Sequence, residues 1–72
     1  MERRYVVKLK SFNTIENFGG KCTWVDYSNP NVCIFCNGYR ENKLLVLAMV
    51  PWHNIDYIQN ALWDIRKDEM IQ

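Results

Sequence analysis

The fold depends most on an uncharged stretch in the middle of the chain, Leu44-Leu45-Val46-Leu47-Ala48-Met49-Val50, which Pro51 ends. All seven residues are apolar. Strands that are apolar on both faces are typical of strands covered on both sides, so residues 44–50 predict such a strand. The stretch is too short to cross a bilayer, which takes about 20 apolar residues in a helix.

Three segments before this stretch predict further strands. Apolar and polar residues alternate over residues 5–10 and again over residues 21–27, which is the period of a half-buried strand. Residues 11–20 show no such period and end in two glycines, so we expect a loop there with Ile15 and Phe18 turned inward.

Residues 28–31, Ser-Asn-Pro-Asn, have the composition of a turn, and residues 32–36 predict the next strand. Asn37-Gly38 suits a two-residue hairpin turn, because both residues tolerate positive φ. The polar residues that follow leave two alternatives. Either the hairpin loop is longer, or Tyr39-Arg40 already pairs and the strand continues outward through Glu41-Asn42.

The C-terminal 22 residues also allow two interpretations. Ile55, Ile58, Leu62 and Ile65 are spaced as on one face of a helix that begins near Pro51. Alternatively, residues 51–54 form a tight turn and residues 55–58 a short strand. A shorter helix then begins at Gln59 or Asn60 and ends near Lys67.

Four or five short antiparallel strands with a proline-containing turn before the last one resemble the layout of small SH3-like and Sm-like barrels. We therefore expect a mainly β fold, an antiparallel barrel of about five strands with a short C-terminal helix, forming one domain over residues 1–72. The alternative is an α+β fold in which one C-terminal helix packs on a four-stranded antiparallel sheet.

The composition restricts the function. Apolar residues make up 49% of the chain, which excludes disorder, and nine Lys and Arg against eight Asp and Glu give a net charge of +1. This balance disfavours nonspecific nucleic-acid binding. The N-terminal residues contain no apolar segment typical of a secretion signal, and three cysteines are an odd number, so we expect a cytoplasmic protein with reduced thiols and no membrane association.

Cys33 and Cys36 have the spacing of a zinc knuckle, and Cys22 and His53 would complete four ligands. This zinc-stabilised domain is an alternative only, because neither Cys22 nor His53 belongs to a second paired element. We expect instead that the cysteines are small buried side chains in strands, with Cys33 and Cys36 on opposite faces, and that the protein needs no cofactor.

We do not expect an enzyme. His53 is the only histidine, Asp56 is its nearest carboxylate in the sequence, and the chain has no nucleophile elbow or phosphate-binding glycine loop. A domain of this size seldom encloses a substrate pocket.

Ten aromatic residues exceed what so small a core can enclose, so some of them must be partly exposed. Exposed Trp and Tyr side chains are typical anchors of protein interfaces. We predict that Trp52, Tyr57, Trp63 and Tyr39 contact a protein partner or a second copy of the chain in a homo-oligomer. The alternative is that they cover the core. For Trp52 this would make the indole a lid over Ile55 and Leu47.

The basic residues of the N-terminal third suggest a different function. If they share one sheet face, they would form a surface for a single-stranded nucleic acid, and they are Arg3, Arg4, Lys8, Lys10 and Lys21. Lysines on an edge strand also prevent edge-to-edge pairing, which is the simpler explanation.

The sequence thus predicts a small cytoplasmic, non-enzymatic protein-interaction module. Its size and its eight asparagines fit a phage or other mobile-element protein that acts as an accessory regulator or inhibitor. A single-stranded nucleic-acid-binding barrel and a zinc-stabilised domain are the two alternatives.

Overall fold

The computed structural model of the chain describes residues 2–63, with the backbone alone for Tyr39, Arg40 and Trp63. Six strands and three short 3-10 turns follow one another in these residues. In chain order they are β1 (Glu2–Leu9), η1 (Ser11–Asn13), β2 (Thr14–Glu16), η2 (Phe18–Gly20), β3 (Trp24–Asp26), β4 (Val32–Arg40), β5 (Lys43–Pro51), η3 (Trp52–Asn54) and β6 (Ile55–Trp63).

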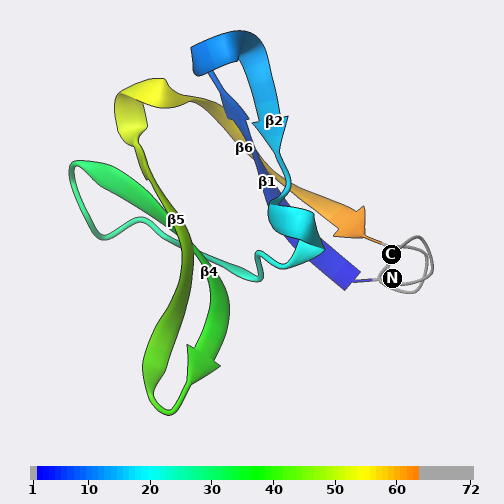
Figure 1. The fold of residues 1–72 in the computed structure, drawn as a ribbon, viewed down its shortest axis with the longest axis vertical. Coiled ribbons are helices and arrows are strands. Elements are labelled where there is room, and N and C mark those ends of the chain that lie inside the picture. Colours follow the sequence, from blue (N-terminus) through cyan, green and yellow to red (C-terminus); the bar gives the residue numbers. More distant parts are fainter. Residues whose placement is uncertain (1, 64–72) are drawn as a thin grey trace.

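The strands form two antiparallel sheets of three strands each, in the orders β2-β1-β6 and β3-β4-β5 (Figure 1). The prediction of a mainly β fold is confirmed. The SH3-like or Sm-like barrel is wrong, because strand pairing within residues 2–63 leaves two separate sheets that do not close. The backbone N–H of Tyr5 in β1 donates to Cys22 O (2.9 Å), in the segment that precedes β3. No helix in this part of the chain is long and apolar enough to cross a membrane.

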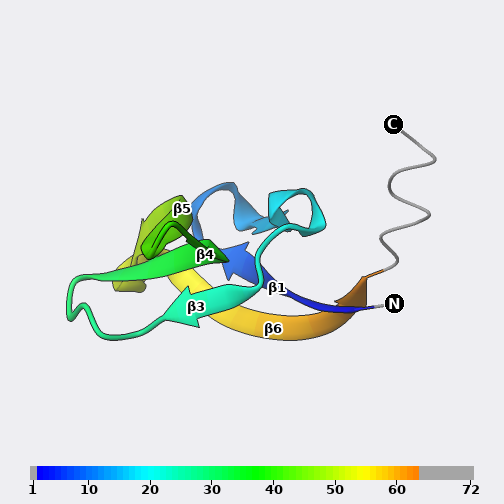
Figure 2. The ribbon, with the colours of Figure 1, turned by 90° about the horizontal axis from the view of Figure 1, so that it is seen from below.

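The core lies where the two central strands, β1 and β4, face each other. Its buried cluster takes members from both sheets and from the segment before β3, namely Val7, Cys22, Val25, Cys33 and Phe35. Phe18 turns inward as predicted and stacks on Phe35 with ring centroids 4.9 Å apart. Ile15 does not, and is exposed in the three-residue strand β2. The Cα trace is only 17 Å thick along its shortest axis, so few side chains are enclosed (Figure 2).

The early strands lie close to their predicted positions. Residues 5–10 fall largely in β1, while residues 21–27 contain only the three-residue β3. The turn at residues 28–31 depends on Asn29, whose Oδ1 accepts hydrogen bonds from the backbone N–H groups of Asn31 (2.8 Å) and Val32 (3.2 Å).

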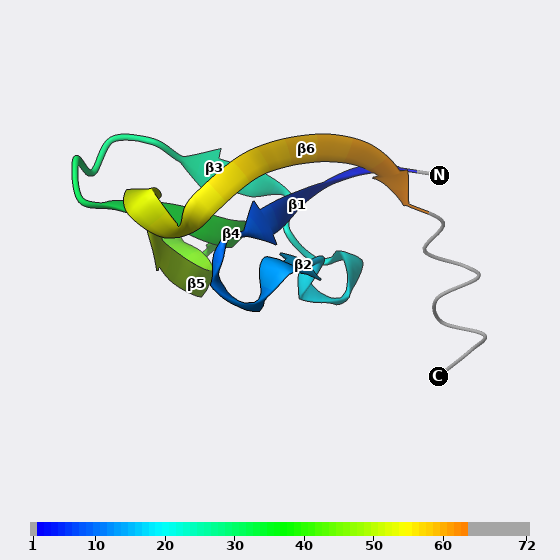
Figure 3. The same cartoon turned by 90° about the horizontal axis from the view of Figure 1, so that it is seen from above.

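The predicted C-terminal helix is wrong for the residues that the structure describes. After the turn η3, β6 is extended from Ile55 to Trp63 and pairs with β1 over most of its length, as Figure 3 shows by the long arc beside β1. Because β1 offers it a continuous edge, hydrogen bonding to that edge outweighs the helical spacing of its isoleucines. Ile65 and the rest of the predicted helix lie outside the described residues.

The hairpin between β4 and β5 follows the second alternative in part. Tyr39 and Arg40 pair with Leu44 and Lys43, and the turn consists of Glu41-Asn42, both with positive φ (53° and 63°). Asn37-Gly38 lies inside β4 at a shift in register, where Gly38 has a φ of +65°. The turn is therefore displaced outward, and the turn end of the hairpin projects beyond the other strands (Figure 1).

The prediction that residues 44–50 are covered on both sides is wrong. β5 is an edge strand of its sheet, and most of its residues are exposed. A strand buried on both faces needs a layer on each side. Within residues 2–63 the other sheet supplies one such layer at most, and of the β5 residues Val50 packs against the core cluster.

Candidate functional site

The largest exposed apolar group on one strand belongs to β5. We call it the β5 surface, and it consists of Leu45, Val46, Leu47 and Met49. Met49 lies opposite Ile34 in the strand ladder, whereas its neighbours Ala48 and Val50 lie opposite the buried Phe35 and Cys33. Met49 therefore points away from the core and is 60% exposed.

Leu47 lies at the point where β5 changes register. Phe35 pairs with Ala48 and Cys36 pairs with Val46, so Leu47 is an extra residue with no partner on β4. Such a bulge bends a strand and increases its twist. In β5 it leaves Leu47 and its neighbour Val46 both exposed, with Val46 at 46%. Leu45, which precedes Val46 and points to the opposite face, is exposed as well, so the strand is accessible on both faces near the bulge.

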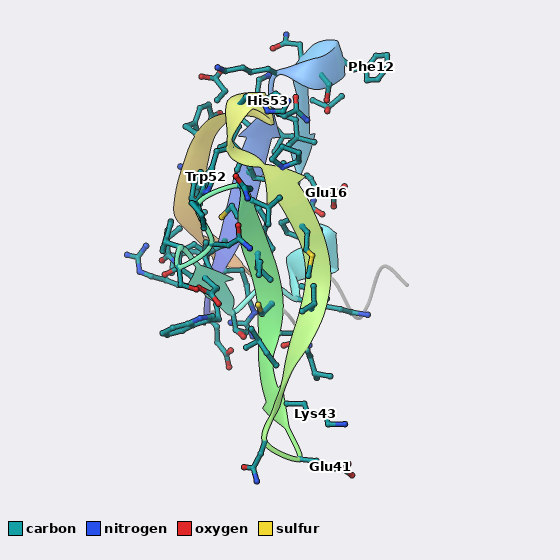
Figure 4. All side chains as sticks on the ribbon, turned by 90° about the vertical axis from the view of Figure 1, so that its left-hand side faces the viewer. Phe12, Glu16, Glu41, Lys43, Trp52 and His53 are labelled. Atoms are coloured by element: carbon teal, nitrogen blue, oxygen red, sulfur yellow. The ribbon has the colours of Figure 1, made fainter. Side chains whose placement is uncertain are left out.

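A second exposed apolar feature is Phe12 in the turn η1. Its ring is 94% exposed and points away from the ribbon (Figure 4). Its backbone has a φ of 56°, in the left-handed region that is unfavourable for residues with a bulky side chain. Strain of this kind persists only where the surrounding structure holds it.

The turn that carries Phe12 is held by its neighbours and by η3. Ser11 N–H donates to Asn54 Oδ1 (2.9 Å), Asn54 Nδ2 donates to Ser11 Oγ (3.0 Å), and Lys10 N–H donates to Asn54 O (2.8 Å). Lys8 Nζ donates to Asn13 O (3.1 Å) on the other side of the turn. The aromatic ring is therefore displayed on a fixed support.

Of the four aromatic residues predicted to bind a partner, the structure describes the side chains of two, Trp52 and Tyr57. Trp52 is half-buried against the core, where its ring stacks on Tyr27 at 5.9 Å and its Nε1 donates to Asn29 O (3.0 Å). Trp52 thus packs on the core together with Ile55, but its stacking and its hydrogen bond are with the loop before β4 and not with Leu47. Tyr57 is exposed on β6.

For the other two of these residues the structure places only the backbone. Tyr39 lies near the tip of the β4–β5 hairpin, and Trp63 lies at the end of β6. Their side chains, and any contact they make, lie outside the described residues. Partner binding by these four residues stays a prediction.

The five basic residues of the nucleic-acid alternative are spread over both faces and the loops. Arg3 alternates with Arg4 and Lys8 along β1, so it lies on the other face of the strand. The Arg4 guanidinium pairs with Glu2 and donates to the backbone oxygen of Gly20 (2.9 Å). Lys10 and Lys21 lie outside the strands, and both are exposed. The geometry therefore does not collect these charges on one sheet face.

All three cysteines are buried and free. Cys33 and Cys36 lie three apart in β4, and both are enclosed. Cys22 lies before β3 and not within a strand. The prediction of small buried side chains is confirmed for all three cysteines, and the prediction that they lie in strands is wrong for Cys22.

The surroundings of the cysteines favour the neutral thiol. Burial raises the pKa of the Cys33 thiol to about 11, with a smaller effect from the neighbouring Cys22, and burial also raises the pKa of Cys22 and Cys36. His53 lies in the exposed turn η3. Within the part of the chain that is described, no three His, Cys, Asp or Glu side chains are placed to hold a metal ion together, so the four ligands of the zinc alternative are not assembled.

Phe12 was missed because residues 11–20 have no periodicity, and nothing in Ser11-Phe12-Asn13 signals a left-handed phenylalanine. The β5 surface did carry a signal. Seven apolar residues in a chain this short need two covering layers, and the rest of the sequence offers few apolar segments to supply them.

Comparison of the chain with protein-family models, curated proteins and solved structures gives no match.

Proposed function

We propose that this protein is a small non-enzymatic interaction module that binds protein through exposed apolar side chains of the sheet β3-β4-β5. The observation that carries the proposal is the β5 surface, an uncharged apolar segment that the described part of the chain leaves in contact with water. Exposed apolar patches of this kind mark sites of protein association.

The rest of that sheet supports the same function. Trp24 on β3 is half exposed, and it comes from the same three-stranded sheet as Met49. An antiparallel sheet with one face on the core normally turns a polar face to water. Here large apolar side chains remain exposed on two of its three strands, which is the composition of an interface core.

The test is site-specific photo-crosslinking in the cells that make the protein. A photoreactive phenylalanine analogue replaces Met49 in one variant and Gln59, an exposed polar residue of β6, in the matched control. We expect discrete protein adducts, to the chain itself or to another protein, from position 49 and few from position 59. Both substitutions lie at exposed positions, so both variants should fold.

Equal adduct patterns from the two positions, or no adducts from position 49, would contradict the proposal. The melting temperatures of both purified variants serve as the folding control, because an unfolded variant would also crosslink to proteins without specificity.

A further inference from the structure

The two sheets present four edge strands, and one differs from the others. β2 and β3 have three residues each, and β6 carries the exposed polar residues Asp56, Gln59 and Asn60. β5 has nine residues, of which the seven between Lys43 and Pro51 are apolar. Proteins usually protect sheet edges by making them short, charged or bulged. β5 is long and carries no charge after Lys43, and its bulge at Leu47 leaves apolar side chains exposed.

A strand placed beside β5 would cover side chains on both faces of this edge strand, whereas a layer packed on one face of the sheet would cover only that face. Leu45 and Val46 follow one another in β5, so their side chains point to opposite faces, and both are exposed. A neighbouring strand contacts side chains on both faces of the edge and also pairs with backbone N–H and C=O groups that an edge strand leaves free.

A second copy of the chain fits this edge on two grounds. Residues 44–50 carry no charge, so an antiparallel copy of the same segment places no like charges opposite each other. With Leu47 opposite its own copy, Lys43 lies across from Pro51. Two-fold pairing also covers the β5 edges of both chains at once and leaves no apolar edge for further growth.

Resting on the proposed function, we propose that β5 pairs antiparallel with β5 of a second copy, around a two-fold axis near Leu47, to join two three-stranded sheets into one sheet of six strands.

The experiment measures the mass of the purified full chain by sedimentation, for the natural sequence and for Leu47→Glu and Leu47→Lys. We expect the natural chain to be a dimer. Each variant alone should be monomeric, with a dissociation constant raised about 100-fold or more by like charges that meet at the axis. An equimolar mixture of the two variants should dimerise again, because Glu then faces Lys.

Leu62→Glu is the matched control. Leu62 is an exposed leucine of β6, at 59%, and it lies opposite Arg3 in the ladder, so the new carboxylate is tolerated there and the dimer should persist. Met49→Glu, at a more exposed position of β5, repeats the test if a Leu47 variant fails to fold.

A natural chain that stays monomeric at hundreds of micromolar would overturn the pairing, and so would a dimer that survives both Leu47→Glu and Met49→Glu. Folded Leu47→Glu and Leu47→Lys chains that do not associate when mixed would overturn the axis near Leu47. A monomer that still crosslinks to another protein through position 49 would refute self-pairing and leave the proposed function standing.

Discussion

At the scale of single residues, Phe12 allows the effect of side-chain packing on stability to be measured separately from the effect of backbone strain. Its ring is almost fully exposed, so Phe12→Ala should leave the free energy of unfolding nearly unchanged. Its φ of 56° is unfavourable for any residue with a Cβ, so Phe12→Gly should be more stable than Phe12→Ala by about 1 kcal/mol. Urea unfolding of the two variants measures the difference.

A clear loss of stability in Phe12→Ala would show that the ring packs against the chain. If both variants keep their stability but form fewer protein adducts through the photoreactive residue at position 49, Phe12 is a second contact of the interaction module.

Trp52 is expected to act on stability. It stacks on Tyr27, packs against the core and donates a hydrogen bond to Asn29 O, so it fixes the loop between β3 and β4. Trp52→Ala removes all three contacts and should cost about 2–4 kcal/mol. Trp52→Phe keeps the stacking and loses the hydrogen bond, and should cost about 1–2 kcal/mol. Thermal melting of both variants gives the order, and an unchanged melting temperature in Trp52→Ala would restore its role as a displayed binding anchor.

The buried thiols predict how stability depends on pH. The pKa of Cys33 is raised from its ordinary value of 9.0 to about 11, so the folded chain holds this proton more tightly than the unfolded chain. The contribution is complete below pH 9 and is lost as the pH rises from about 9 to 11. The melting temperature should therefore fall over this interval.

Cys33→Ala is the control for this pH dependence, because burial also raises the pKa of Tyr27, which therefore contributes to the loss of stability at alkaline pH as well. The variant should lose about 1–2 kcal/mol at neutral pH and show a shallower decline above pH 9. A decline as steep as that of the natural chain would assign the effect to other groups. A chelator should leave the melting temperature of the natural chain unchanged, since the cysteines are packed as small apolar side chains.

At the scale of elements, the turn between β4 and β5 is where a substitution is most clearly expected to stabilise the chain. Glu41 and Asn42 both have positive φ, which the two-residue turn requires and which Asn and Gly adopt more readily than Glu. Replacing Glu41-Asn42 by Asn-Gly should stabilise the chain by about 1 kcal/mol, measured by denaturant unfolding. The opposite change, Gly38→Ala, places a Cβ at a φ of +65° and should destabilise it by about the same amount. No gain from Asn-Gly would mean that the hairpin tip contributes little to the folded state.

The elements also show what the sequence could and could not predict. Alternation located β1, and the apolar run located β5, because these signals are local. The location of the second turn depended on whether Tyr39-Arg40 pair, which the residues alone left open. β6 was misjudged because isoleucines spaced three and four apart fit a helix, while the deciding fact is the free edge of β1, which lies more than 40 residues away in the chain.

The candidate site was predicted in kind and not in place. A surplus of large apolar and aromatic side chains indicated exposed ones, and the structure shows them on β2, β3, β5 and β6, in η1 and in the loop after β3. Among the predicted residues whose side chains are described, Tyr57 is exposed and Trp52 is half-buried. The reason is the same for Trp52 and Met49. Whether an apolar residue is enclosed depends on which strands and loops pack against it. Trp52 follows Pro51 in a turn, but Tyr27 and Asn29 of the loop between β3 and β4 contact it and leave it half-buried.

At the scale of the whole molecule, the core joins the two sheets into one unit. Val7 of β1 and Phe35 of β4 belong to one buried cluster, while the described strands of the two sheets do not pair with each other. The sheets therefore depend on side-chain packing to stay together. Because the cluster is small, we expect both sheets to unfold in a single cooperative step.

Hydrogen exchange measured residue by residue tests this expectation. The slowest amides of β1 and of β4 should exchange with the same free energy of opening, equal to that of global unfolding. Val7→Ala removes two buried methyl groups and should lower that free energy by about 2 kcal/mol in both sheets alike, although the change lies in only one of them. Protection could instead fall in the sheet β2-β1-β6 and stay constant in β3-β4-β5. The second sheet would then be stable without the first. Its stability would have to come from outside the core, most directly from the strand of a second copy that covers β5.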